Sequence, residues 1–319
     1  MGVDNVLQFT VVTADGEERT ANACSEQDLF WALRGGGGSA FGVLTSVTYK
    51  THPALSNVVI GGITWKGSNA VETNAVTVAA IKLFPTLSKS NWSAYLTAVP
   101  FGQGDSGALV IQPNSPFGGE VAAGNYTGVN ATFASLFGLG GTNVSAQYYA
   151  FPTYYSFVDT VITDVAIGVN SITGGRLLDE NALTNKAEAI VTMATADPTT
   201  SGAFHLVAGG AVSTFAPDSV ALHPYWRKAF VSFNFGTGWA SNTTAVVKEA
   251  LKTSLTSKIQ ALALLVGEDA ASYTNEADAQ EPQWRKAFWG PHYPRLLAIK
   301  SKVDPKNVFT CNRCVGSEL

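Results

Sequence analysis

Residues 28–45 read Asp28-Leu29-Phe30-Trp31-Ala32-Leu33-Arg34-Gly35-Gly36-Gly37-Gly38-Ser39-Ala40-Phe41-Gly42-Val43-Leu44-Thr45. The stretch begins as a short helix, because Leu29, Phe30 and Leu33 place an apolar face at helical spacing. Ser25 precedes Asp28 by three residues, and this spacing predicts a capping box at the start of the helix.

A glycine hinge follows this helix and leads into a strand. Gly35 stands where a helix C-terminus favours positive φ, and residues 43–49 alternate with the period of a strand. The glycines let the backbone approach a ligand closely. A dinucleotide fingerprint needs the reverse order, strand then glycines then helix, so that interpretation is excluded. A flexible linker is the alternative, but linkers are not normally held between a helix and a β-branched strand.

The composition is that of a globular protein. A chain of 319 residues can hold more than one structural unit, and 46% of its residues are hydrophobic against 14% charged. A net charge of −4 and a pI near 5.6 argue against a nucleic-acid partner. No apolar run approaches the length that crosses a bilayer, so we expect no membrane partner.

The three cysteines, Cys24, Cys311 and Cys314, are too few for a disulfide scaffold or a four-thiolate zinc site. Cys311-x-x-Cys314 lies near the chain end without the helix N-terminus that a redox motif needs. A structural disulfide and two free thiols both remain open as alternatives to a redox role. No cluster of His, Asp and Glu has metal-ligand spacing, so no metal is expected.

N-glycosylation sequons suggest a secreted protein. They stand at Asn91, Asn125, Asn130, Asn143 and Asn242. No signal peptide precedes the first expected strand. We therefore expect the chain to begin part-way through a longer secreted protein.

Alternation and periodicity divide the chain into a small first piece and a longer middle region. Residues 6–13 and 17–21 read as a hairpin around Asp15-Gly16, and this α+β piece ends near residue 53. In the middle region, strands are expected at 58–65, 92–99, 107–112, 203–215 and 228–236. Helices are expected at 69–83, 154–164, 180–195 and 243–266, and loops at 113–130 and 138–144. Clustered strands favour an α+β fold over a doubly wound sheet.

The tail, 267–319, is rich in aromatic residues. Its landmarks are Ser272-Tyr273-Thr274-Asn275-Glu276-Ala277-Asp278, Pro282-Gln283-Trp284-Arg285-Lys286-Ala287-Phe288-Trp289-Gly290, and the run from Tyr293 to Phe309. Gly290-Pro291 predicts a break between two helices, and Pro305 predicts the end of the second.

Both ends of the chain resemble one family. Residues 21–52 resemble the flavin-side run of the berberine-bridge-enzyme-like FAD-linked oxidases of fungal type, in the vanillyl-alcohol-oxidase (PCMH) superfamily. The tail resembles the same family through its Tyr-x-Asn-Glu-Ala-Asp run, its Tyr293–Phe309 run and Cys314-Val315-Gly316-Ser317-Glu318. The middle region matches in general character and in His223-Pro224-Tyr225-Trp226-Arg227.

The resemblance implies a fold and an activity. It implies part of a PCMH-type FAD-binding domain at 1–53, a substrate domain at 54–266 and a tail at 267–319 that returns to the FAD-binding domain. The substrate domain would be a mainly antiparallel sheet covered by helices. The cofactor would be FAD, and a small-molecule alcohol, sugar or secondary metabolite would lose hydride to flavin N5, with molecular oxygen as acceptor.

The resemblance also implies site residues. Tyr273 becomes the candidate general base and Asn275 a positioning group. A phenol, with an ordinary pKa near 10, needs a nearby cation or hydrogen bonds for this role, and Arg227 and Lys228 are candidates. The expected flavin neighbours are Asn275 itself and Gly36, Gly37, Gly38, Phe41, Gly42, Val43, Tyr293 and Asn307.

Two departures from the family pattern leave rival hypotheses open. His292 stands where the family usually has asparagine, and the family's first FAD-binding half, with its covalent histidine and cysteine, is not found. One rival is a truncated fragment without catalysis, and the other is a secreted carbohydrate-binding glycoprotein.

Overall fold

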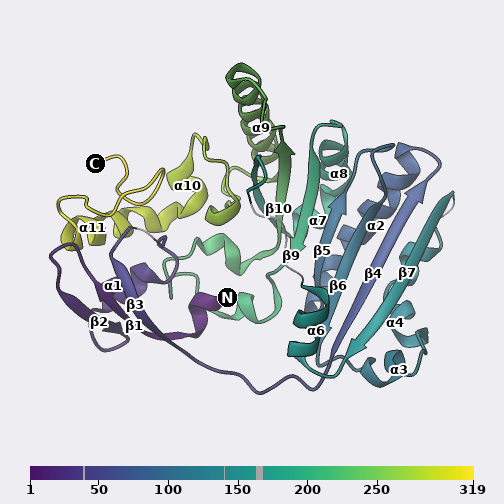
Figure 1. Cartoon of the computed structure of the whole chain (residues 1–319), viewed down its shortest axis with the longest axis horizontal. Coiled ribbons are helices and arrows are strands. Elements are labelled where there is room, and N and C mark those ends of the chain that lie inside the picture. The colour runs from purple at the N-terminus through teal and green to yellow at the C-terminus, as the bar shows by residue number, and fades with distance from the viewer. Residues whose placement is uncertain (39, 140, 163–167) are drawn as a thin grey trace.

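The computed structural model describes residues 1–38, 40–139, 141–162 and 168–319. Figure 1 shows two sheets side by side, the smaller one beside the C-terminal helices and the larger one with its own helices. The smaller sheet has three strands and the larger has seven. The α+β class expected from the sequence is confirmed.

The three-stranded sheet has the order β2-β1-β3, with β1 at Val6–Val12, β2 at Glu18–Asn22 and β3 at Val43–Tyr49. Both strand pairs are antiparallel. The expected hairpin and the strand after the glycines are therefore confirmed. Helix α1, Gln27–Leu33, packs on this sheet through Phe30, whose ring meets that of Phe9 edge-on at 6.1 Å.

The predicted capping box is wrong. Helix α1 starts at Gln27, its N-cap is Glu26 with a left-handed φ of 47°, and no side chain caps it. Asp28 instead accepts a hydrogen bond from Arg295 in the tail, at 2.8 Å. Asn22 Oδ1 accepts from the backbone N–H of Ser25, so the chain turns before the helix begins.

The larger sheet has the strand order β7-β4-β6-β5-β9-β10-β8, and each neighbouring pair is antiparallel. Its strands are β4 (Val58–Gly67), β5 (Ser93–Ala98), β6 (Ser106–Pro113), β7 (Thr142–Phe151), β8 (Ser171–Asp179), β9 (Ser201–Leu206) and β10 (Ala229–Gly238). The expected antiparallel sheet with helices is thereby confirmed.

Helices cover one face of this larger sheet. They are α2 (Ala70–Lys89), α7 (Glu180–Asn185), α8 (Ala187–Thr195) and α9 (Ala245–Val266). Phe204 and Phe233 point into this core, where they meet Phe84, Ile190 and Ile259. Side chains alternate along a strand. The residues next to Phe204 in β9 and next to Phe233 in β10 therefore point to the opposite face of the sheet, which we call the open face.

Two expectations for the middle region are corrected. The helix expected at 180–195 is two helices, because Lys186 has a non-helical ψ of 3° and Asp179 caps the first one separately. The strand expected at 203–215 ends at Leu206, because Gly209 and Gly210 take positive φ values of 80° and 49°. A 3₁₀ turn follows at Gly210–Thr214.

The expected loops also contain structure. The short helices α3 (Gly118–Ala122), α4 (Thr127–Thr132) and α5 (Ala134–Phe137) occupy or follow 113–130, and β7 begins inside 138–144. These helices are too short to give a periodic signal. Helix α6 spans Tyr154–Val161, and the end of the expected 154–164 lies outside the described residues.

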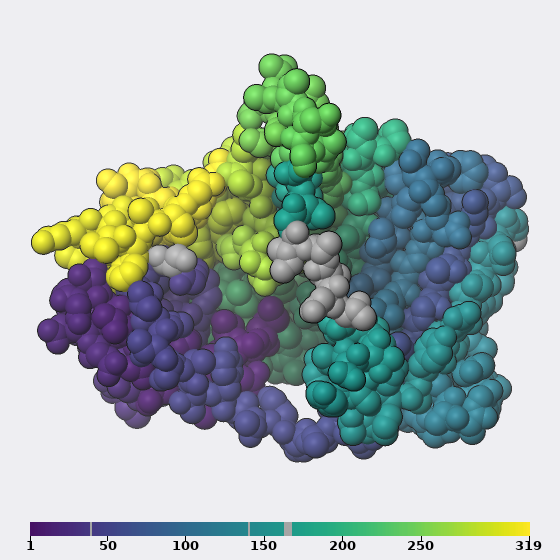
Figure 2. Space-filling model, viewed as in Figure 1, coloured from purple at the N-terminus to yellow at the C-terminus, as the bar shows by residue number. Residues whose placement is uncertain are grey.

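The tail contains helices α10 (Trp284–Phe288) and α11 (Tyr293–Val303), as predicted on either side of Gly290-Pro291. Leu296 of α11 packs with Trp31 and Phe41 in the core of the smaller unit. Figure 2 shows the C-terminal segment lying against the N-terminal one. None of the described helices is long and apolar enough to cross a membrane.

Candidate functional site

A pocket of about 580 Å³ lies where the glycine hinge meets the tail. Its size falls within the ~300–1,000 Å³ of small-molecule sites. The residues that line it are Gly37, Gly38, Tyr273, Thr274, Asn275, Phe288, Trp289, Cys311, Asn312, Arg313 and Cys314. The fold therefore brings Tyr273 and Asn275 together with Gly37 and Gly38, from opposite ends of the sequence.

Two glycines present open backbone to this pocket. Gly37 has a φ of +105°, and a Cβ built on it would lie 3.6 Å from the Trp289 ring. A Cβ on Gly38 would meet nothing within 4 Å. The indole Nε1–H of Trp289 donates to the Gly35 carbonyl at 3.0 Å, which ties this wall to the tail.

Three other glycines of this stretch, Gly35, Gly36 and Gly42, pack closely against neighbouring backbone. A Cβ on Gly36 would lie 2.4 Å from the Ala32 carbonyl oxygen, and one on Gly35 would lie 2.4 Å from the Leu222 nitrogen. A Cβ on Gly42 would lie 2.6 Å from the carbonyl oxygen of Val12 in β1. These glycines allow the backbone segments to touch.

The other expected flavin neighbours in this stretch lie outside the pocket lining. Phe41 is buried in the core of the smaller unit, and Val43 is exposed on β3. Their roles toward a flavin remain predictions.

Tyr273 is anchored on its N-terminal side by a buried ion pair. Arg176 of β8 pairs with Glu281 of the tail at 2.8 Å, and the two side chains are only 4% and 1% exposed. Arg176 also donates to the hydroxyl of Ser272, which in turn donates to the Gly175 carbonyl at 2.6 Å. The residue before Tyr273 is thus fixed to the edge of the larger sheet.

A second anchor follows Tyr273. Thr173 Oγ1 donates to the backbone oxygen of Glu276 at 3.2 Å, and Asn234 Nδ2 donates to the Glu276 carboxylate at 2.7 Å. The Tyr273 ring itself meets Trp226 edge-on at 5.6 Å. Both flanks of Tyr273 are therefore held to one sheet, and Tyr273 lines the pocket between them.

Arg313 is a site residue that the sequence did not indicate. Among the described residues that line the pocket, it carries the positive charge. The earlier candidates lie elsewhere, since Arg227 makes a bidentate pair with Asp4, at 2.6 and 2.9 Å, and Lys228 pairs with Asp269. Arg313 lies between the two cysteines, so the tight loop there was the available signal.

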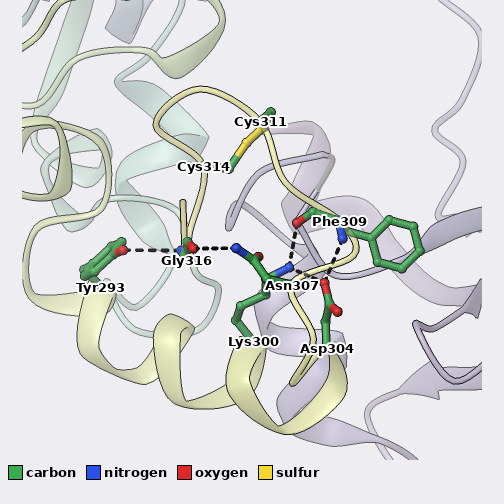
Figure 3. The surroundings of a disulfide bond; sticks show 8 residues. All are labelled: Tyr293, Lys300, Asp304, Asn307, Phe309, Cys311, Cys314 and Gly316. Atoms are coloured by element: carbon green, nitrogen blue, oxygen red, sulfur yellow. Dashed lines mark hydrogen bonds and ion pairs between the residues drawn. A yellow bond between two sulfur atoms is a disulfide. The ribbon is translucent and has the colours of Figure 1, made fainter. Parts of the chain in front are cut away.

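Figure 3 shows how the end of the tail is held together. Asn307 Nδ2 donates to the Gly316 carbonyl at 3.2 Å, and Lys300 pairs with Asp304 and donates to the Phe309 carbonyl at 2.6 Å. Tyr293 shares a hydrogen bond with Glu318, and burial raises the pKa of the Tyr293 hydroxyl.

Tyr293 and Asn307 therefore make structural contacts in the tail, and neither lines the pocket. Cys311 and Cys314 form a disulfide, which closes the loop that carries Arg313. Of the alternatives left open by the sequence, the structure thus selects the disulfide.

His292, which replaces the family's asparagine, is buried beside Trp31 at a ring distance of 5.2 Å. Burial lowers its pKa. His292 is not among the residues that line the pocket. Within the described ranges, no group of three or more His, Cys, Asp or Glu residues could hold a metal ion.

Comparisons with known proteins point to one group of flavoproteins. Residues 272–316 match the family model described as "Berberine and berberine like". An "Uncharacterized FAD-linked oxidoreductase" of Arthroderma benhamiae is 34% identical over 325 residues, which cover 100% of this chain and 55% of the relative. The FAD-linked oxidoreductase apf9 of Gibberella fujikuroi is 32% identical over 356 residues, 100% of this chain and 57% of the relative.

The fold has a solved counterpart. The VAO-type flavoprotein MtVAO713 from Myceliophthora thermophila C1 superposes with a TM-score of 0.84 and 27% identity, over 99% of this chain and 57% of that one. The fold therefore matches the C-terminal portion of a VAO-type flavoprotein.

Within that class, the chain is similar over its whole length to FAD-linked oxidoreductases, and its tail matches the berberine-like family model. It spans about half the length of the curated relatives it matches.

Proposed function

We propose that this protein is an FAD-dependent oxidase that takes hydride from a carbon of a small alcohol, sugar or secondary metabolite to flavin N5, with molecular oxygen as electron acceptor. One observation carries the proposal, the pocket that sets the open backbone of Gly37 and Gly38 beside Tyr273 and Asn275.

The residues present fit the ring of a flavin. Gly37 and Gly38 leave space where side chains would stand, as a flat ring lying against backbone requires, and Phe288 and Trp289 add apolar surface. When bound, the flavin supplies the electron acceptor for the substrate hydride. The protein groups then have two tasks, orienting the substrate and holding the proton that leaves it.

Tyr273 is the group assigned to the proton. As the phenolate, Tyr273 would take the proton of the substrate hydroxyl as the carbon loses its hydride, and would become the neutral phenol. Arg313, in the lining of the same pocket, supplies a positive charge there, and its guanidinium donates to the Asp278 carbonyl at 3.4 Å. Asn275 orients the substrate through its amide, because it lies in the lining next to Tyr273.

The test uses the protein made from the complete reading frame that contains this chain. Tyr273→Phe should lower kcat by about 10² or more, the contribution of a positioned base, and leave the flavin content unchanged. Tyr155→Phe, at an exposed tyrosine of α6, is the matched control. Unchanged turnover in Tyr273→Phe would remove Tyr273 from the mechanism, and a colourless protein without peroxide production would favour a non-catalytic fragment or a carbohydrate-binding protein.

We further propose that the protein is a secreted glycoprotein. All of its sequon asparagines are exposed, which supports glycan attachment at Asn91, Asn125, Asn130, Asn143 and Asn242. Mass spectrometry of the natural protein before and after glycosidase treatment tests this. An unmodified mass in the secreted fraction would contradict glycosylation, and absence of the protein from that fraction would contradict secretion.

A further inference from the structure

We propose that an N-linked glycan on Asn143 shields the open edge of the larger sheet and keeps copies of this chain from pairing there. The inference rests on the proposal that the protein is a secreted glycoprotein. It adds to that proposal one particular modified residue and the physical effect of its glycan.

Strand β7 is an edge strand of the larger sheet. It pairs with β4 over its whole length, from Thr142 to Phe151. Among the described residues, no backbone hydrogen bond joins β7 to a segment on its other side. An edge strand leaves the backbone N–H and C=O groups of alternate residues without partners, so it can pair with a strand of another chain. Figure 1 shows β7 at the outer side of the sheet, away from the tail.

The opposite edge of the same sheet is covered. There the Leu177 N–H of β8 donates to the Ala271 carbonyl of the tail at 2.7 Å. Helix α6 packs at the C-terminal end of β7, where the rings of Phe157 and Phe151 lie 5.9 Å apart. Asn143 stands at the other end of β7, so the glycan and the helix would protect different parts of this strand.

The sequence of β7 favours pairing with another chain. Its ten residues, Thr-Asn-Val-Ser-Ala-Gln-Tyr-Tyr-Ala-Phe, include no charged residue, no proline and no glycine. Natural edge strands are often protected by a lysine, another charge or a proline, and uncharged strands with high β-propensity tend to associate. Tyr149 is 54% exposed and adds apolar surface. The composition of β7 therefore calls for protection of another kind.

A glycosylation sequon lies within this strand, at Asn143-Val144-Ser145. Ile63 of β4 points into the helix-covered core, and it is directly opposite Ala146. Because side chains alternate along a strand, Asn143 and Ser145 lie on the open face, where both are exposed. An N-linked glycan is bulky and hydrated, and an added strand would lie only about 4.8 Å from β7. A glycan on Asn143 would therefore occupy the space that this strand needs.

The surface beside Asn143 has room for the first sugar. A pocket of about 380 Å³ adjoins the residue, and Thr64, Lys66 and Asp105 are part of its lining. Lys66 is directly opposite Asn143 on β4 and pairs with Asp105 at 3.7 Å. The ammonium, carboxylate and hydroxyl groups can form hydrogen bonds with the hydroxyls of a sugar. The site is therefore both accessible and polar.

The glycan site is far from the candidate pocket. Strands β7 and β8 are the two edges of the seven-stranded sheet, so at the usual strand spacing they lie roughly 30 Å apart. Loss of the glycan should therefore change self-association and leave the oxidase activity of each subunit unchanged.

The experiment compares the self-association of the complete protein with and without this glycan. Ser145→Ala removes the sequon and keeps Asn143, and Asn242→Gln removes the sequon before α9 as the matched control. Mass spectrometry of glycopeptides measures the occupancy of Asn143, and sedimentation velocity measures association. Ser145→Ala should associate at concentrations about tenfold lower than the wild type or Asn242→Gln, because the strand edge is then open.

Two further variants locate the association. Asn143→Gln removes the same glycan by a different change and should behave as Ser145→Ala does. Gln147→Lys, added to Ser145→Ala, places a charge at an exposed position of β7 and should restore the association of the wild type. Amide hydrogen exchange within 143–151 should slow when Ser145→Ala associates.

The inference fails if Ser145→Ala and Asn143→Gln associate no more than Asn242→Gln, or if hydrogen exchange shows that they associate through another segment. Glycans at other sequons beside an unmodified Asn143 would overturn this inference alone. A secreted protein without any glycan would overturn the glycoprotein proposal as well. The oxidase proposal is tested separately, by the turnover of Tyr273→Phe.

Discussion

The two sheets of the molecule are covered to different extents at their edges, and the tail accounts for the difference. At the edge of the larger sheet, the Leu177 N–H of β8 donates to Ala271 of the tail at 2.7 Å, and a buried ion pair follows. At the edge of the smaller sheet, β3 is exposed along its whole length. The candidate pocket forms where the tail packs, which indicates that the tail provides both stability and the site.

The largest loss of stability is expected when the buried ion pair between Arg176 and Glu281 is broken. Arg176→Met leaves Glu281 without its partner in a buried position and should lower the free energy of unfolding by about 3–5 kcal/mol in urea titrations. Lys82→Met breaks the exposed pair with Glu188 and should cost at most about 1 kcal/mol.

The double variant Arg176→Met/Glu281→Leu sharpens that prediction. It replaces both charges by apolar groups and should recover most of the lost stability. An effect of Arg176→Met no larger than that of Lys82→Met would show that the tail does not depend on this pair.

A pH effect of similar size is expected at His223, a buried histidine that contacts the tail. Burial lowers the pKa of His223 to about 4, its Nδ1 accepts from the Tyr225 N–H, and its Nε2 faces the Lys286 carbonyl. The unfolded chain takes up a proton below its ordinary pKa of about 6.5, and the folded chain does so only near 4. The free energy of unfolding should therefore fall, by up to about 3 kcal/mol, as the pH drops from about 6.5 to about 4.

His223→Asn keeps an acceptor and removes the titration. The comparison is the difference in unfolding free energy between pH 7 and pH 4.5, which should be smaller in His223→Asn than in the wild type. Equal differences in the two proteins would contradict a buried, neutral His223.

The hinge allows the stability effects of substitutions at two nearby glycines, Gly36 and Gly38, to be compared. Gly36→Ala places a Cβ 2.4 Å from the Ala32 carbonyl oxygen and should cost about 1–3 kcal/mol. Gly38→Ala meets nothing within 4 Å and should change stability by less than about 0.5 kcal/mol. Thermal unfolding of both variants is the measurement, and equal losses would show that the two halves of the hinge are not packed differently.

The smallest effect is expected at the exposed strand. Val47→Thr in β3, where the side chain is 44% exposed, should change the free energy of unfolding by less than about 0.5 kcal/mol. The same change at Val59 in β4, which is 0% exposed, buries a hydroxyl and should cost about 1–3 kcal/mol. A large loss at Val47 would mean that β3 is covered in solution.

Local signals in the sequence predicted the smaller unit well. The alternation of 43–49 corresponds to β3, and Gly35 adopts positive φ, at 119°. Short-range patterns suffice there because each element is set by neighbouring residues. The capping box failed because Asp28 has a stronger partner, Arg295, which is distant in the sequence.

Long-range contacts explain what the sequence did not reveal. Strands β7 and β8 were missed, and the chain around Gly174 and Gly175 has a composition that reads as a loop, although it pairs with β10. The link between Arg176 and Glu281 spans 105 residues, and Arg313 reaches the pocket through a disulfide loop. Tyr273 and Asn275 were found through the family motif, because no local pattern marks them.

The account's central claim is that a flavin lies against Gly37 and Gly38, facing Tyr273. The most direct measurement is the visible absorbance and circular dichroism of the flavin in the complete protein, wild type against Gly38→Phe. Gly38 lines the pocket, and a Cβ built on it would meet nothing within 4 Å. The account predicts that the flavin spectrum is lost or shifted while the far-ultraviolet circular dichroism of the backbone stays unchanged. An identical flavin content and spectrum in Gly38→Phe would contradict it.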